Sequence, residues 1–143
     1  MLRTSEREYL TPYRLSDVLA LIQVLAFDIH AHRSEEGVRA EIQIDPRSAN
    51  TWSEVAAQHP EFFRAVLSEE HGVSLLARHV TPRGPDGKHP RLQGDQVDSL
   101  LKAAIEMHDR QATRADRWKS LLPLWTAVLS VVGTLAAVWV GKH

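Results

Sequence analysis

Histidine is the residue type whose abundance first suggests chemistry in this sequence. The chain has eight histidines and no cysteine, so thiolate metal sites and disulfides are excluded. The densest group is Asp28, His30 and His32, but residues two apart on a helix point about 200° away from each other. We interpret them as the last turn of a helix, where histidine interacts favourably with the helix dipole. No metal or other cofactor is predicted, and the isolated histidines include His59, His79 and His108.

Nucleophilic catalysis has little support in the sequence. Ser53 and Ser74 have no general base near them in the chain. There is no Gly-x-Ser-x-Gly motif and no glycine-rich phosphate loop. The glycines at 84 and 87 instead have the composition of a turn. We therefore predict that the protein is not an enzyme.

Two arginines form the most distinctive remaining feature. Arg64 and Arg78 lie in stretches that we expect to pair as strands, where they would approach each other on one face. Like charges call for an acidic partner such as Glu61, which would make a structural ion pair, or for an external anion or acidic protein. Both interpretations remain open. The candidate interaction surface consists of Arg64, Arg78, His79 and Arg83.

The elements that must position these residues begin after a polar lead-in, residues 1–15. Ser16 is a good N-cap, and apolar residues recur at steps of three and four to about His32, which predicts an amphipathic helix. Residues 34–44 fit two patterns. Ser34 with an acidic first turn favours a helix, while the alternation of apolar and polar residues is typical of a strand. We favour the helix.

A third helix is expected from Asn50 or Thr51 to Pro60, because Thr51 and Glu54 have the spacing of a capping box. Trp52 lies on its apolar face, and we expect Trp52 and Phe63, the bulkiest apolar residues of this region, to fill the core. The pattern then becomes that of a β-hairpin, with a strand at 62–66, a turn at 68–72 and a returning strand at 73–80. The expected fold class is therefore mainly α with one β-hairpin.

This order of three helices and a hairpin resembles the winged helix-turn-helix architecture over residues 16–80. The resemblance rests on element order and on the hydrophobic pattern. In a DNA-binding member, the third helix would present Arg, Lys, Asn or Gln to the bases. Residues 50–60 contain only Asn50, Gln58 and His59 beside Glu54. The chain up to Arg91 also carries eleven Lys or Arg against thirteen Asp or Glu, a net charge of −2, so we expect protein contact rather than nucleic-acid binding.

Residues 81–94 are rich in proline and glycine and predict a linker loop. Residues 95–120 return to helical periodicity and predict a long amphipathic juxtamembrane helix. Its apolar first half should pack on the domain or on a copy of itself. Pro123 either starts a new helix or kinks a continuous one.

Residues 121–140 contain no ionisable side chain. As a helix they would extend about 30 Å, the hydrocarbon thickness of a bilayer, so we predict a single transmembrane helix. Basic residues precede this span and only Lys142 follows it, so the positive-inside bias places the N-terminus in the cytoplasm, at an inner membrane. The expected membrane-interface anchors are Trp118, Lys119, Trp125, Trp139 and Lys142.

Small and hydroxyl residues within the span permit close helix packing and a possible homo-oligomer. They are Ser130, Gly133, Thr134 and Ala137. The start of the chain has no apolar segment typical of a signal peptide, so the span is expected to act as a tail anchor. The expected function is a membrane-tethered cytoplasmic interaction module, an adaptor or sensor with a protein partner at the bilayer. An oligomerising membrane effector and a membrane-anchored nucleic-acid regulator are the alternatives.

Overall fold

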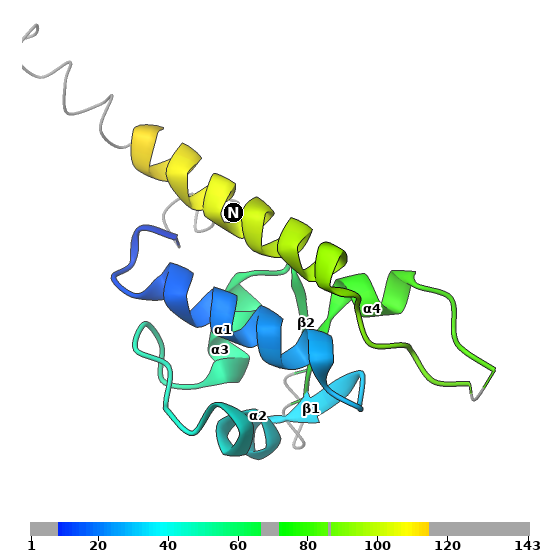
Figure 1. Cartoon of the computed structure of the whole chain (residues 1–143). Helices are drawn as coiled ribbons and strands as arrows, with labels where there is room; N and C mark the ends of the chain where they lie inside the picture. The colour runs from blue at the N-terminus through cyan, green and yellow to red at the C-terminus, as the bar shows by residue number, and fades with distance from the viewer. Residues whose placement is uncertain (1–8, 67–71, 86, 115–143) are drawn as a thin grey trace, which may run out of the picture. The chain divides into compact units, whose positions relative to one another are not determined.

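The computed structural model describes residues 9–66, 72–85 and 87–114. The chain divides into two units, Met1–Asp109 and Arg110–His143, and the architecture below is that of the first unit. Of the second unit, the structure describes residues 110–114, which are helical. The first unit is mainly helical with a small antiparallel sheet, which confirms the predicted fold class at this level (Figure 1).

Seven elements are bounded within the described residues, and helical residues 94–114 follow them. In chain order they are α1 (Arg14–Phe27), β1 (His32–Ser34), α2 (Glu35–Ile42), α3 (Trp52–Gln58), β2 (Phe63–Val66), β3 (Gly72–Leu75) and α4 (Leu76–Val80). Helix α1 packs against α2, α3 and β3, and α3 also packs against β2.

Helix α1 begins two residues before the predicted N-cap and ends five residues before the predicted end. Tyr13 is its N-cap and has a φ of 66°, with no side-chain cap. Arg14 is buried and donates to the hydroxyl and the carbonyl of Ser48, which fixes the first turn against the loop before α3. Asp17 accepts from the backbone N–H groups of Arg47 and Ser48 at 3.0 and 2.8 Å. Long-range hydrogen bonds therefore place the helix start, and Ser16 is not the cap.

Residues 35–42 form a helix, which confirms the favoured alternative for this stretch. The Ser34 hydroxyl caps α2 by accepting from the N–H of Gly37 at 3.2 Å. Helix α3 begins at its predicted cap, where the Thr51 hydroxyl accepts from the N–H of Glu54 at 3.1 Å. The Glu54 carboxylate accepts in return from the N–H of Asn50 at 3.0 Å, one residue before the cap.

The sheet has the order β1-β3-β2, and both pairs are antiparallel. The hairpin strands pair Phe63 with Leu75 and Arg64 with Ser74. The third strand, β1, was not predicted, because three residues are too short to show an alternating pattern. Gly72 accommodates this strand, since a Cβ there would lie 1.8 Å from the imidazole of His32.

The returning strand ends at Leu75, and the prediction that it continues to Val80 is wrong. Residues 76–80 form the short helix α4. The N–H of Leu76 still donates to the carbonyl of Phe62 at 2.9 Å, and the chain then turns away from the sheet. Arg78 is consequently carried into the interior and does not face Arg64 on the hairpin.

One hydrophobic core contains residues from α1 to α3 and also residues from the helical segment that begins at residue 94. It includes Trp52 and Phe63, which the sequence predicts as core fillers, together with Leu21 and Ile22 of α1. Val97 and Ala104 of helical residues 94–109 are buried in the same core, which confirms that the apolar first half of this helix packs on the domain. Figure 1 shows this helix in yellow-green.

The lead-in also packs more closely than predicted. Tyr9 is only 3% exposed and Arg14 is equally buried, so the described part of the lead-in is attached to the domain at these two residues. The predicted transmembrane helix, its interface residues and its small-residue face lie outside the described residues. Within the described part of the chain, no helix has the length and apolar character needed to cross a bilayer.

Candidate functional site

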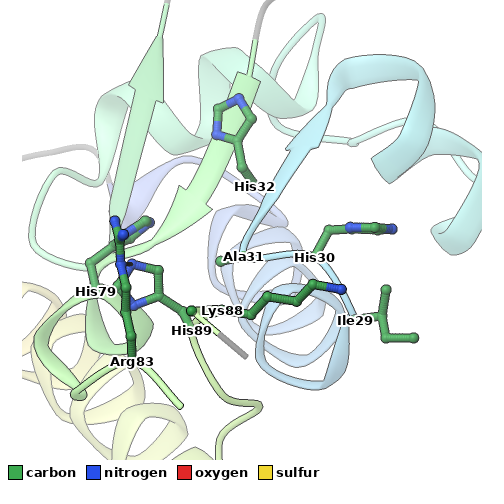
Figure 2. A pocket seen from close by; sticks show the side chains of 9 residues that line it. Ile29, His30, Ala31, His32, His79, Arg83, Lys88 and His89 are labelled. Carbon is green, nitrogen blue, oxygen red and sulfur yellow. Dashed lines mark hydrogen bonds between the residues drawn. The ribbon is translucent and has the colours of Figure 1, made fainter. Parts of the chain in front are cut away.

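A pocket of about 460 Å³ lies where three separate segments meet. The first follows α1, the second is α4 with the residues after it, and the third is the loop that leads to residue 94 (Figure 2). The lining residues are Ile29, His30, Ala31, His32, His79, Arg83, Gly87, Lys88 and His89. Four of the eight histidines of the chain therefore line one pocket.

Arg78 organises the backbone behind this pocket. Its side chain is 0% exposed, and its guanidinium donates only to backbone carbonyls in the described structure. Three of these carbonyls belong to the end of α1 and the residues after it, and two belong to the loop before residue 94. The acceptors are Leu25, Asp28, His30, His89 and Pro90, at 2.9 to 3.1 Å.

The planar guanidinium suits this task because it presents five N–H donors in a fixed geometry. Burial lowers the pKa of Arg78, and the nearby Asp28 carboxylate opposes that effect. Arg78 thus connects, through hydrogen bonds, the segment after α1 that carries His30 and the loop that carries His89.

The loop that carries Lys88 and His89 is shaped by a short turn. The N–H of Gly84 donates to the carbonyl of Lys88, and the N–H of Gly87 donates to the carbonyl of Gly84, both at 2.9 Å. Gly87 has a φ of +73°, a conformation that side-chain-bearing residues seldom adopt. The turn therefore holds Lys88 and His89 at the pocket.

His79, His89 and Arg83 gather on one side of the pocket (Figure 2). The two imidazole rings meet edge to face with centroids 4.6 Å apart. Arg83 Nε donates to His89 Nε2 at 3.4 Å. Because His89 Nε2 accepts this bond, the proton of a neutral His89 lies on Nδ1, which is buried and has no hydrogen-bond partner within the described structure.

The other lining side chains have different directions. His30 and Lys88 extend towards Ile29, and His32 points towards the sheet, where its ring lies close to Gly72 (Figure 2). A neighbouring hollow of about 400 Å³ shares Ile29, Lys88 and His89 with the pocket and adds Arg91. The cationic surface therefore continues from one hollow into the next.

The electrostatic environment of the pocket is positive. Partial burial lowers the pKa of His79, and the nearby His89, Arg64, Arg78 and His32 lower it further. Among the described lining residues, none is Asp or Glu. This group of basic residues and histidines is a poor environment for a cation and a favourable one for an anion.

Two acidic residues adjoin lining residues in the sequence, Asp28 before Ile29 and Asp86 before Gly87. Of these two, the structure describes Asp28, which has other partners. Asp28 accepts from the N–H of His30 at 2.7 Å and also pairs with Arg33. Burial by itself would raise the pKa of Asp28, but these two hydrogen bonds and the charge of Arg33 hold it below its ordinary value. Asp28 therefore fixes the segment after α1.

The fold places only some of the predicted site residues at the pocket. His79 and Arg83 line the pocket, and Arg64 is an exposed residue close enough to His79 to lower its pKa. Arg78 is buried and is not part of a surface. The expected ion pair of the arginines with Glu61 is also wrong, because Glu61 accepts from Tyr9 at 2.5 Å and from His59 at 3.0 Å.

The candidate interaction surface omitted four polar lining residues, His30, His32, Lys88 and His89. Lys88 was recognised in the sequence only as part of a basic loop, with Arg83 and Arg91, that could meet anionic headgroups or an acidic partner. His30 and His32 follow α1 and do not belong to its last turn, so the dipole interpretation is wrong for them. The abundance of histidine was the available signal. It did not reveal convergence, because His30 and His32 are 56 to 59 positions away from Lys88 and His89.

The geometry also bears on a metal site and on the role of His59. Within the described residues, no group of three His, Asp or Glu is placed to hold a metal ion. His59 contacts Tyr9 and Glu61 instead and is internal, since its side chain is 0% exposed. Burial would raise the pKa of Glu61, but hydrogen bonds from His59 and Tyr9 lower it. This cluster attaches the start of the chain to α3.

Comparisons with known proteins add no relative. No family model matches the chain, and no curated protein or solved structure matches it either.

Proposed function

We propose that the protein is a membrane-tethered cytoplasmic interaction module, an adaptor or sensor without catalysis of its own, whose pocket face contacts an acidic protein. The observation that carries the proposal is the clustering of two cationic side chains with four histidines. The chain up to Arg91 has a net charge of −2, yet Arg83, Lys88 and four histidines line one pocket. Such local concentration of charge favours encounter with a partner of opposite sign.

The arrangement of elements supports a winged-helix type of domain. Three helices, α1 to α3, precede the hairpin of β2 and β3, as in the resemblance proposed from the sequence. Helix α3 has only seven residues, and Trp52, Ser53, Val55 and Ala56 are buried in it. Its exposed surface is small, which favours protein contact over insertion into a DNA groove.

The sequence of residues 121–140 supports the tether. Twenty residues without an ionisable side chain suffice to span a bilayer, and the basic residues before them favour a cytoplasmic domain. Tethering raises the effective concentration of the domain for any partner at the same membrane. The proposed activity is therefore recruitment or sensing at the inner membrane.

Alkaline carbonate extraction tests the tether. Membranes from cells that express the full chain should retain the protein in the pellet after carbonate washing, because a spanning helix is not released by loss of electrostatic contacts. A variant that ends at residue 120 is the control and should be released. Release of the full chain into the supernatant would contradict the tether.

Recovery of partners in mild detergent tests the interaction face. The double variant Arg64→Gln and Arg83→Gln removes two exposed charges near His79. The matched control, Arg39→Gln and Lys102→Gln, removes two exposed charges elsewhere. A partner that is recovered with the wild type and the control, but lost with the pocket variant at unchanged melting temperature, supports the proposal. Equal recovery with all three proteins would contradict it.

A further inference from the structure

We propose that the pocket between the end of α1, α4 and the loop before residue 94 binds a phosphoryl group, as a free phosphate or a phosphate monoester, and binds it more tightly when its histidines are protonated. The inference rests on the proposed function, because it names the chemistry that the same face would recognise. It assigns a ligand class to the pocket and a dependence on pH.

The donors of the pocket match an oxyanion with several acceptor oxygens. Arg83 offers a planar guanidinium beside His79 and His89, and Lys88 contributes an ammonium group to the lining. The Nδ1 atom of His89 lacks a hydrogen-bond partner within the described structure. A phosphoryl group accepts several charge-assisted hydrogen bonds at once and carries close to two negative charges near neutral pH, so it can engage more of these donors than a carboxylate can.

Histidine gives the site its dependence on pH. The charged and titratable groups that lower the pKa of His79 come from several elements: His32 of β1, Arg64 of β2, Arg78 of α4 and His89 of the loop. Of these, His89 is in ring contact with His79, whereas Arg78 acts from the interior. All of these groups are basic, so protonation of His79 is disfavoured in the empty pocket. An anion in the pocket would reverse this effect. By linkage, an anion that favours protonation of the histidines must itself bind more tightly as the pH falls.

The carboxylate of Asp28 does not replace the anion. It already accepts from the N–H of His30 and pairs with Arg33, and Asp28 does not line the pocket. The apolar residues Ile29 and Ala31 also line the pocket and offer contact to the organic part of a monoester. A volume of about 460 Å³ accommodates a phosphate with such a substituent.

The test uses the full chain in a non-ionic detergent and follows the imidazole C–H resonances by NMR during titration. The probes are inorganic phosphate, O-phosphoserine, sulfate and acetate. Sulfate stays a dianion throughout the range, so its affinity isolates the protonation of the protein. We expect sulfate to bind about tenfold more tightly near pH 6 than near pH 7.5, because histidine charges between these values. Phosphate should show a smaller gain, since its own second pKa is about 6 to 7.

Variants assign the binding to the pocket. His79→Gln and Arg83→Gln should each weaken sulfate binding near pH 6 by about tenfold, the loss expected for one charge-assisted contact. Arg39→Gln is the matched control, because this exposed arginine of α2 pairs with Asp45 and neither residue lines the pocket. His79 and Arg83 are both exposed, so the melting temperatures of their variants should stay close to that of the wild type. If one of the two variants fails to fold, the sulfate affinity of the other tests the site.

The outcomes separate this inference from the proposed function. Tighter binding of O-phosphoserine than of inorganic phosphate would assign the site to a monoester, and the reverse order would assign it to free phosphate. Absence of resonance shifts with both phosphate and sulfate near pH 6, or equal affinities for Arg83→Gln and Arg39→Gln, would overturn the inference. Carbonate extraction and partner recovery do not depend on these titrations, so failure here leaves the tether and the protein contact to their own tests.

Discussion

Arg78 shows how a single side chain can hold a site without facing it. The guanidinium donates to carbonyls on both sides of the pocket, and one of its nitrogens serves Leu25, Asp28 and His30 together. These carbonyls include the end of α1, where the last turn of a helix leaves acceptors without intrahelical donors. Arg78 therefore satisfies a backbone carbonyl at the C-terminal end of α1 and holds the following segment, which carries His30, in place.

Replacement of Arg78 by methionine should destabilise the protein strongly. Methionine keeps much of the side-chain volume but leaves buried carbonyls without donors, which we expect to cost about 3 kcal/mol in the free energy of unfolding. Urea denaturation followed by circular dichroism measures this. Arg64→Met is the matched control, since Arg64 is exposed and its loss should cost less than about 0.5 kcal/mol. Equal effects of the two substitutions would contradict the role of Arg78.

Asp28 gives a prediction about pH. Its folded-state pKa lies below the ordinary value of about 3.9. The ionised carboxylate therefore stabilises the fold above that pH, and the contribution is lost as the pH falls towards the folded-state pKa. The difference in free energy of unfolding between the wild type and Asp28→Asn should be largest near neutral pH and should shrink below about pH 4.

The control for this prediction is Asp45→Asn. Asp45 pairs with Arg39 at 2.8 Å, but both side chains are more than half exposed, and exposed ion pairs contribute little to stability. Denaturation series across the acid range provide the measurement. A difference for Asp28→Asn that stays constant from neutral pH to about pH 3 would show that its carboxylate has no such role.

At the scale of elements, Glu35 links the N-terminal end of α2 to the N-terminal end of α3. It lies in the first turn of α2, yet its carboxylate accepts from the N–H groups of Trp52 and Ser53 at 2.8 and 2.7 Å. These are the first residues of α3, whose N–H groups have no intrahelical acceptor. The Ser53 hydroxyl also donates to this carboxylate at 2.6 Å. Helix α3 therefore has a cap from α2 in addition to Thr51.

Glu35→Ala should therefore reduce the free energy of unfolding by about 2 kcal/mol, because buried donors at the start of α3 lose a charged acceptor. Glu36→Ala is the matched control: it is the next residue on the same helix and is exposed. Thermal denaturation of both variants measures the difference. The linkage would be refuted by a melting temperature of Glu35→Ala that equals that of Glu36→Ala.

At the scale of the whole molecule, the absence of cysteine from the sequence allows a clean test of orientation. Single cysteines are introduced at Ser99, which is exposed in the described helix, and at Gly141, beyond the proposed span. In intact cells whose outer layers are permeable to the reagent, a maleimide that cannot cross the inner membrane should label Gly141→Cys. Ser99→Cys should react only after lysis, because the positive-inside bias places residue 99 in the cytoplasm.

Labelling of Ser99→Cys in intact cells, with Gly141→Cys protected until lysis, would reverse the proposed orientation. Labelling of both positions before lysis would indicate that the reagent enters the cell. A cytoplasmic protein with one added cysteine serves as the control for that possibility. The experiment therefore addresses localisation independently of any partner.

The sequence determined the local features of this protein. The caps at Ser34 and Thr51 are correct, as are the helical alternative for residues 35–42 and the loop before residue 94, because each depends on residues within one or two turns. Trp52 and Phe63 are also in the core as expected, since large apolar side chains are seldom left in water.

The tertiary structure alone decided the site. His30 and His89 are 59 positions apart, and no periodicity within either segment shows that Arg78 binds both backbones. The same buried guanidinium accounts for the early end of α1, and the turn into α4 carries it into the interior. Hydrogen bonds between distant segments outweighed the local preferences for a longer helix and a longer strand, and this is why His30, His32, Lys88 and His89 were not assigned to the candidate surface.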